Sequence, residues 1–95
     1  MAAYVIANIH VTDPAKYDAY KILAAASIAA HGGRYLARGG KHEVLEGHWS
    51  PHRLVILEFD TYEAAIGWHE SQEYDAPKDL RQKIAVSEIV VVDGL

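Results

Sequence analysis

Hydrophobic and polar positions alternate along residues 3–11 with the two-residue period of a β-strand. One side is small and apolar and the other is mixed: Ala3, Val5, Ala7, Ile9 and Val11 against Tyr4, Ile6, Asn8 and His10. The pattern predicts a strand whose apolar side lies under helices.

The period then changes to that of a helix. Asp13 is a good N-cap acceptor, and Pro14 suits the first helical position because its missing N–H has no partner there. Apolar and aromatic residues follow at helical spacing, at Tyr17, Tyr20, Ala24 and Ile28. Gly32 is typical of a left-handed helix terminator, so a helix is predicted from Asp13 to about His31.

Four further runs of β-branched and apolar residues predict strands, at residues 34–38, 43–47, 53–59 and 86–93. The sequence DTYE at residues 60–63 resembles a capping box and predicts a second helix. Ser71 is another start signal, and Pro77 is predicted to begin a further helix that ends near Ile84.

If residues 34–47 form one bent strand, the element order is β-α-β-β-α-β. This is the split βαβ pattern of a ferredoxin-like α+β sandwich. The 95 residues form one domain, 1–95. Its helices can cover only one face of the antiparallel sheet, so we expect the open face to form a homodimer.

The pair Gly39-Gly40 decides whether that strand is bent or folded back. A Gly-Gly pair suits a two-residue hairpin turn. A hairpin there and a second reversal near Pro51 would make residues 34–38 parallel to residues 53–59, whereas the split βαβ order needs them antiparallel. A bulge or bend in one long edge strand keeps the right direction, and we favour it.

The charge and the hydrophobicity of the chain argue against two kinds of partner, nucleic acids and membranes. The chain has nine Lys+Arg, thirteen Asp+Glu, a net charge of −4 and no basic cluster, so we expect no nucleic-acid partner. No apolar run approaches the length of a membrane span, and the N-terminus does not resemble a signal peptide. We therefore expect no membrane association and a cytoplasmic location. The absence of cysteine excludes disulfides and thiolate catalysis.

Glycine pairs and histidines raise the question of a cofactor. A phosphate loop needs glycines between a strand and a helix N-terminus, and neither pair, at 32–33 or 39–40, has that context. The histidines of the same region lie around a turn and not at helical metal-binding spacing: His42, His48 and His52. We expect turns, surface histidines, and no metal or other cofactor.

Polar residues on the predicted open face form the first candidate site. Asn8, His10, Arg38 and Glu58 are expected to converge there, and such groups in a cleft acquire the shifted pKa values that proton transfer needs. We predict His10 and Glu58 as catalytic residues and Asn8 and Arg38 as ligand-binding residues. The alternative is an Arg38–Glu58 ion pair that only fixes the dimer interface.

Trp68, Tyr74 and Arg81 form the second candidate site. The two aromatic rings and the planar guanidinium would close over a small acidic ligand, which makes all three predicted ligand-binding residues. The alternative is that Trp68 and Tyr74 belong to the core and that Arg81 pairs with Asp75 or Glu73.

Several motifs resemble those of the family called domain of unknown function 1330: GGRYLARGG, EVLEG, RLVILEFD, SQEY and VVVDG. The resemblance extends from Tyr4 to Leu95 and implies a ferredoxin-like fold of the dimeric α+β barrel superfamily. That superfamily includes cofactor-independent monooxygenases, muconolactone isomerase-like enzymes and haem-degrading proteins. Gln72 stands where the family usually has proline. The family has no established activity, so the resemblance assigns no catalytic residue.

Two functional hypotheses follow. The first is a homodimeric, cofactor-independent enzyme or binder that holds a small acidic molecule in a cleft beside the sheet. The second is a non-catalytic dimer module in which the same polar residues only fix the interface. A cavity beside Arg38, Glu58 and His10 would favour the first hypothesis.

Overall fold

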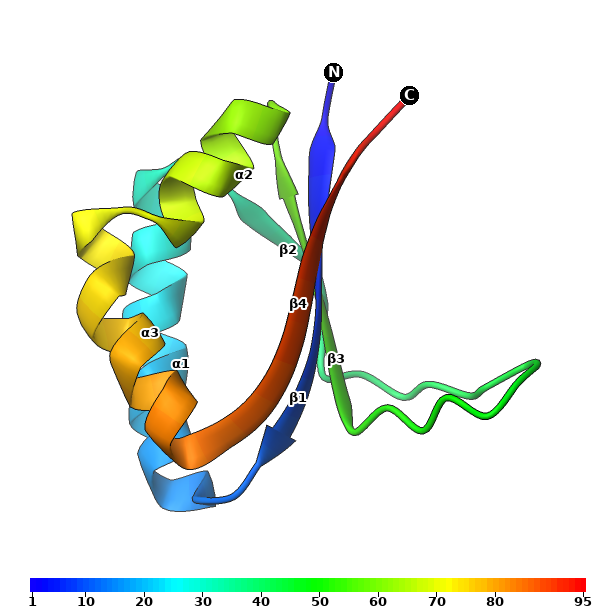
Figure 1. The fold of residues 1–95 in the computed structure, drawn as a ribbon. Helices are drawn as coiled ribbons and strands as arrows, with labels where there is room; N and C mark the ends of the chain where they lie inside the picture. The colour runs from blue at the N-terminus through cyan, green and yellow to red at the C-terminus, as the bar shows by residue number, and fades with distance from the viewer.

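The alternating residues form β1 (Ala3–Val11), which pairs antiparallel with a neighbour on each side. The computed structural model describes residues 1–95. The other elements are, in chain order, α1 (Pro14–Ala30), β2 (Arg34–Arg38), β3 (Arg53–Phe59), α2 (Tyr62–His69), α3 (Gln72–Ile84) and β4 (Ala85–Asp93). The sheet has the order β2-β3-β1-β4, and the helices cover one face only (Figure 1). The predicted ferredoxin-like α+β sandwich is confirmed.

The predicted ends of α1 are confirmed by its capping contacts. The Asp13 side chain accepts a hydrogen bond from the Lys16 N–H at 3.2 Å, and Pro14 is the first helical residue. Gly32 follows the helix with a positive φ of 75°, which glycine adopts without steric cost. No helix of the protein combines the length and the apolar character needed to cross a membrane.

The two later helices begin at side-chain caps. Thr61 accepts from the Ala64 N–H and begins α2, and Ser71 accepts from the Tyr74 N–H and begins α3. The prediction that Pro77 begins a helix is wrong, because the Ser71 cap starts α3 earlier and leaves Pro77 inside it. Pro77 is buried, so its packing offsets the backbone hydrogen bond that proline cannot donate.

Residues 39–52, here called the arm, contain no strand and project from the sheet on the side away from the helices (Figure 1). The prediction of a strand at residues 43–47 is therefore wrong. Every residue from 39 to 50 is exposed, and this segment lies beside no partner strand. Residues 43–47 have an alternating pattern but no neighbouring strand. A strand needs such a neighbour to form hydrogen bonds with its backbone N–H and C=O groups.

β2 has the predicted direction relative to β3, but the bulge lies before Gly39-Gly40 and not at it. β2 runs antiparallel to β3, so the hairpin is excluded. The irregularity lies earlier, between Tyr35 and Ala37, and makes Leu36 the extra residue of a bulge. Gly39, at φ 70°, makes the last contact with the sheet through a 2.8 Å hydrogen bond to the Leu54 carbonyl, and the arm begins there.

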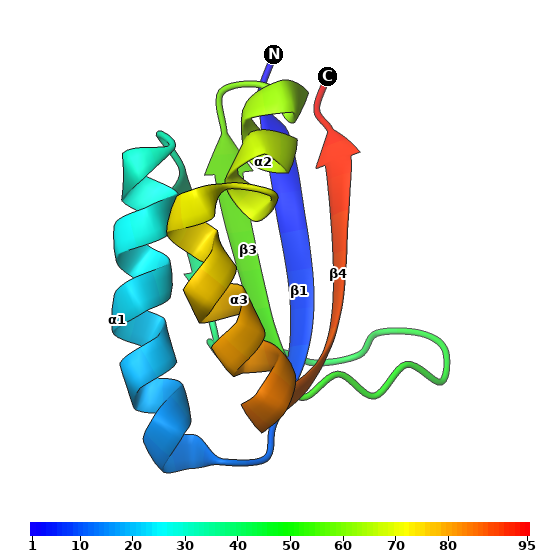
Figure 2. The same ribbon diagram turned by 60° about the vertical axis from the view of Figure 1, so that its left-hand side comes forward.

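The core lies between the sheet and the helix layer. Figure 2 shows α1 and α3 side by side along the length of the sheet, with α2 crossing near its upper end. The largest fully buried side chains are Tyr74 of α3 and Phe59 of β3. Long aromatic side chains therefore fill the space under the helices, and the remaining cavities are lined by them.

Replacing Gly33 with alanine is expected to lower the free energy of unfolding by about 1–3 kcal/mol, because the added methyl group overpacks the core. A Cβ at this position would lie 2.5 Å from Phe59 Cε2 and 2.8 Å from Ile28 Cγ2. Urea denaturation followed by circular dichroism measures the change. Gly40→Ala is the matched control, because a Cβ there meets no atom within 4 Å. Equal stability of the two variants would contradict the expected clash.

Candidate functional site

The open face of the sheet has an apolar middle and polar ends. The strand register places one apolar residue of each strand in a single row across the face, namely Ala37, Ile56, Ile6 and Val90. The row on one side contains Arg34 and Glu58, and the row on the other contains Asn8 and Glu88. Apolar centres with polar rims are typical of protein–protein interfaces.

The two predicted proton-transfer residues lie far apart on this face. Glu58 is opposite Tyr4 on β1, six positions from His10, which corresponds to roughly 20 Å along a strand. Glu58 accepts a 2.7 Å hydrogen bond from Arg34 Nε, and the His10 ring stacks on the His52 ring at 4.1 Å. The open face therefore does not bring His10 and Glu58 into one site.

Asn8 is the predicted residue that stays close to His10. Its Oδ1 accepts a 2.8 Å hydrogen bond from the His52 backbone N–H at the root of the arm. Its Nδ2 lies 3.5 Å from Glu88 Oε1 on β4. Asn8 thus joins three neighbouring segments, and its amide atoms are occupied by protein partners.

The prediction that Arg38 lies on the open face is wrong. The bulge at Leu36 adds one residue to β2, so Arg38 comes opposite Val55, whose side chain is buried under the helices. A strand of alternating side chains that gains one residue turns every later side chain to the other face. Arg34 therefore makes the ion pair with Glu58 that the sequence suggested for Arg38.

Arg38 lines a pocket between α1 and the sheet that we call the arginine–tyrosine pocket. Its polar lining comes from α1, β2, β3 and α3 and includes Tyr17, Tyr20, Tyr35, Arg38, Arg53 and Tyr74. The Arg38 guanidinium lies 4.4 Å from the centre of the Tyr35 ring and donates a 3.4 Å hydrogen bond to the Lys21 carbonyl of α1. The cavity is small, about 30 Å³, which holds about two water molecules.

Arg53 reaches the same pocket from β3. Its guanidinium lies 5.5 Å from the centre of the Tyr17 ring, and its Nε is buried without a hydrogen-bond partner. A Cβ on Gly39 would collide with the Arg53 guanidinium. The second glycine pair thus leaves room for an arginine of the pocket, in addition to its role at the root of the arm.

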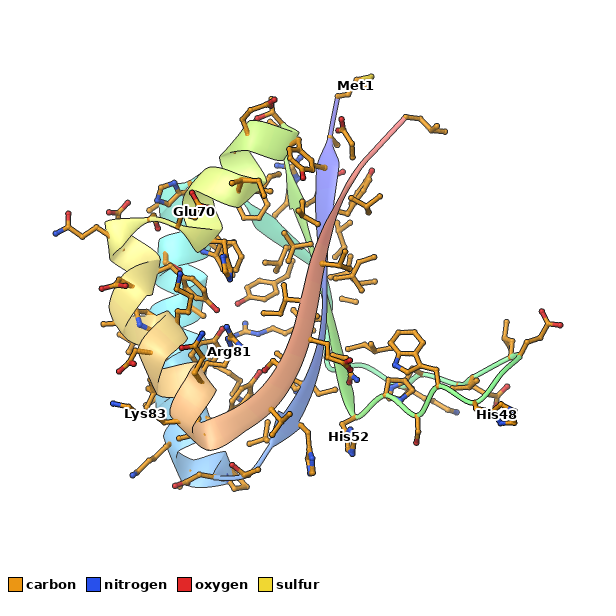
Figure 3. All side chains as sticks on the ribbon, in the orientation of Figure 1. Met1, His48, His52, Glu70, Arg81 and Lys83 are labelled. Carbon is orange, nitrogen blue, oxygen red and sulfur yellow. The ribbon has the colours of Figure 1, made fainter.

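Arg81 approaches from α3 into the space between the helices and the sheet (Figure 3). It is only 5% exposed, and its Nε donates a 3.2 Å hydrogen bond to the Tyr74 hydroxyl. The Tyr74 and Tyr20 hydroxyls lie 2.6 Å apart, so the three residues form one buried chain. The suggested pairing of Arg81 with Asp75 or Glu73 does not occur, because Arg81 turns inward.

Trp68 closes the end of the pocket beside Tyr74. It is 3% exposed, its Nε1 donates a 3.1 Å hydrogen bond to the Ser27 hydroxyl, and its ring centre lies 4.3 Å from that of Tyr74. The alternative that Trp68 and Tyr74 belong to the core is correct. Both residues also line the pocket.

The positive charges of the arginines at and beside the pocket have no carboxylate partners. No ion pair of the protein includes Arg38, Arg53 or Arg81. Burial raises the pKa of Tyr20 and of Tyr35, so both hydroxyls stay protonated near neutral pH. The pocket therefore offers cationic and neutral hydrogen-bond donors and no carboxylate.

Sequence reasoning missed several residues of the pocket, namely Tyr17, Tyr20, Tyr35 and Arg53. The helical spacing indicated that Tyr17 and Tyr20 face inward, but it assigned them only to the core. Six tyrosines in 95 residues was the composition signal available. No group of three or more His, Asp or Glu side chains is placed to hold a metal ion.

One known family pattern covers nearly the whole sequence of this protein. The pattern described as domain of unknown function (DUF1330) matches residues 2–95, almost the whole chain. The chain belongs to this family. No curated protein matches it. The resemblance seen in the sequence is thus confirmed.

Solved structures similar to this member of the domain of unknown function 1330 family show the same fold. A protein of unknown function from Rhodopseudomonas palustris has a TM-score of 0.78 at 17% identity, over 99% of this chain and 82% of that one. SnoaB, a cofactor-independent oxygenase from Streptomyces nogalater, has a TM-score of 0.68 at 11% identity, over 99% and 93%. A dimeric protein of unknown function with a ferredoxin-like fold, from Bacteroides fragilis, has a TM-score of 0.68 at 14% identity, over 98% and 96%.

Proposed function

We propose that the protein is a homodimer that binds one small organic anion per subunit in the arginine–tyrosine pocket, as a cofactor-independent enzyme or binding protein. The observation that carries this proposal is the pair of pocket-lining guanidinium groups without a carboxylate partner, Arg38 and Arg53, with the unpaired Arg81 beside them on Tyr74. Arg53 is partly buried and Arg81 is buried, a cation without a counter-ion is costly in such surroundings, and an anionic ligand would supply the missing charge.

The donors of the pocket suit a carboxylate with an aromatic or other flat body. A guanidinium binds a carboxylate through two parallel N–H groups, and the Arg53 Nε has no protein partner. The tyrosine rings and Trp68 supply flat apolar surfaces for the body of the ligand. Trp68 and Tyr74 of the second predicted site line the pocket, and Arg81 donates a hydrogen bond to Tyr74 beside it, so all three remain in the proposal together with Arg38.

The ligand must enlarge the pocket, because the present 30 Å³ is too small for it. Arg38 is the element placed to move. It is exposed on the edge strand, and its one hydrogen bond, to the Lys21 carbonyl, is long at 3.4 Å. We propose that Arg38 exchanges this carbonyl for the carboxylate of the ligand.

Relatives of similar fold support catalysis without a cofactor and a dimeric assembly. The structure from Streptomyces nogalater is that of a cofactor-independent oxygenase, and the one from Bacteroides fragilis is dimeric. In this protein the apolar row across the open face supports dimerisation, and so does the arm. Leu45 and Trp49 of the arm are 86% and 56% exposed, which a partner subunit would cover.

The competing proposal is the dimer module without a ligand. The tight packing of the pocket favours it, since a cavity of about 30 Å³ resembles an ordinary packing defect. On this proposal Asn8, His10 and Glu58 act only at the rim of the dimer interface. Both proposals share the dimer and differ in the use of the pocket.

Replacing Arg38 with alanine is expected to weaken the binding of small carboxylates by about tenfold to a hundredfold, the usual worth of a hydrogen bond to a charged group. Isothermal titration calorimetry with benzoate and salicylate measures the change. The matched control is Arg34→Ala on the same strand, because Arg34 lies on the opposite face and pairs with Glu58 and Asp60. Light scattering checks that both variants remain dimeric.

Two results would favour the dimer module instead. One is that none of the probes, nor a wider panel of aromatic and aliphatic carboxylates, binds to the wild-type protein. The other is that Arg34→Ala and Arg38→Ala weaken binding equally, which would point to a general effect of surface charge.

A further inference from the structure

A second cavity lies between α2 and the β1–β4 side of the sheet. Its apolar walls are Val5, Ala65, Trp68, Ile89 and Val91, and its volume is about 120 Å³. Cavities of about 150 Å³ lined by such side chains hold one benzene molecule, so this cavity has room for about one ring. Three residues line both this cavity and the arginine–tyrosine pocket, namely Val5, Trp68 and Ile89.

His69 and Glu70 are the ionisable residues that line this cavity. His69 is the last residue of α2 and has no hydrogen bond from either ring nitrogen to another residue. Lys78 Nζ donates a 2.8 Å hydrogen bond to its carbonyl, and the Tyr74 ring lies 5.9 Å from its own.

The surroundings of His69 keep its imidazole neutral. Burial lowers the pKa of His69, and the charges of Lys78 and Arg81 lower it further, against a smaller opposite effect of Glu70. The residues that face it from the strands, Ile89 and Val91 among them, carry no charge. A neutral imidazole near pH 7 accepts a proton, which is the requirement for a general base.

We propose that this cavity binds a one-ring phenol or enol and that His69 accepts the proton of its hydroxyl group. The O–H bond of the ligand breaks and an N–H bond forms on the imidazole. The products are a phenolate or enolate and an imidazolium, so charge balances and neither oxidant nor reductant is required. The site uses neither Arg38 nor Arg53 of the arginine–tyrosine pocket.

The chemistry of the cavity selects this ligand class. A carboxylic acid has already lost its proton near neutral pH and gives His69 nothing to accept. Lys78 and Arg81 lower the pKa of His69 more than the cavity-lining Glu70 raises it, so the balance of charge at this position disfavours a ligand cation. A weakly acidic hydroxyl on an apolar ring fits both the walls and the base.

The test uses para-nitrophenol, whose phenolate absorbs at a longer wavelength than the phenol, and toluene, which fits the cavity but has no acidic proton. Bound to the wild-type protein, para-nitrophenol is expected to show the phenolate spectrum at a lower pH than in buffer. His69→Gln is expected to lose this shift and to bind para-nitrophenol about tenfold to a hundredfold more weakly. Its affinity for toluene, measured by calorimetry, is expected to stay unchanged.

Matched variants locate the effect. His48→Gln makes the same substitution on the distant arm (Figure 3) and is expected to keep the shift. Ala65→Leu fills the cavity and is expected to weaken both probes. Arg38→Ala is expected to keep the binding of para-nitrophenol, so a failure of the carboxylate proposal is distinguishable from a failure of this one. The proposal is overturned if neither probe binds, or if His69→Gln retains the phenolate spectrum.

Discussion

Replacing Ile56 with aspartate is expected to leave the protein monomeric at concentrations where the proposed wild-type dimer forms. Ile56 lies in the middle of the open face, between Ala37 and Ile6 in the apolar row. In a two-fold dimer the substitution enters the interface twice, and each unpaired charge must be desolvated. An increase of at least about a hundredfold in the dimer dissociation constant follows.

Size-exclusion chromatography with light scattering measures the assembly. The matched control is Ile22→Asp, since Ile22 is 74% exposed on α1, on the helix side of the protein. Circular dichroism should show both variants folded, because neither isoleucine belongs to the buried core. A wild-type monomer at high micromolar concentration would refute the proposed dimer, and a dimeric Ile56→Asp variant would refute its placement on the open face.

Replacing Tyr74 with alanine is expected to lower the free energy of unfolding by about 3–5 kcal/mol, the usual cost of deleting a buried aromatic side chain. Tyr74 is fully buried, packs its ring on Trp68, and joins Tyr20 to Arg81 through its hydroxyl. The loss combines a cavity with a buried arginine deprived of its partner. Urea denaturation measures the change.

Two further variants separate the ring from the hydroxyl. Tyr74→Phe keeps the packing but leaves Arg81 Nε and the Tyr20 hydroxyl without a partner, and is expected to cost about 1–3 kcal/mol. Tyr62→Ala removes a tyrosine that is 39% exposed on α2 and is expected to cost less. A Tyr74→Phe variant as stable as the wild type would show that the hydroxyl chain contributes nothing to stability.

The aromatic half of the candidate site was predictable from the sequence. Trp68 and Tyr74 recur at inward positions of the later helices, and Arg81 lies two turns after Tyr74 on the same side of α3. Local periodicity decides which side of a helix is buried. For this reason these three residues were found together, and the structure places all three at the helix–sheet boundary.

The strand half of the site was not predictable. The alternation along residues 34–38 assigned Arg38 to the open face and Tyr35 to the other, on the assumption of regular pairing. The bulge at Leu36 breaks this assumption, and it exists only because β2 must match the register of β3. Arg53, at the start of β3, was not predicted as a site residue, because the Tyr17 ring that it faces in the pocket comes from α1.

The sequence by itself determined the start of α1, the buried side of β1 and the α+β sandwich. Each depends on interactions within a few residues, such as the Asp13 cap, or on a regular period. Tertiary structure alone decided that residues 39–52 form an arm, that Arg38 turns to the helix side of the sheet, and that Arg38 and Arg53 line one pocket without a carboxylate. The reason is that a bulge, or a pocket lined by side chains from several elements, depends on contacts between segments that are far apart in the sequence. Such contacts do not change the hydrophobic periodicity of either segment.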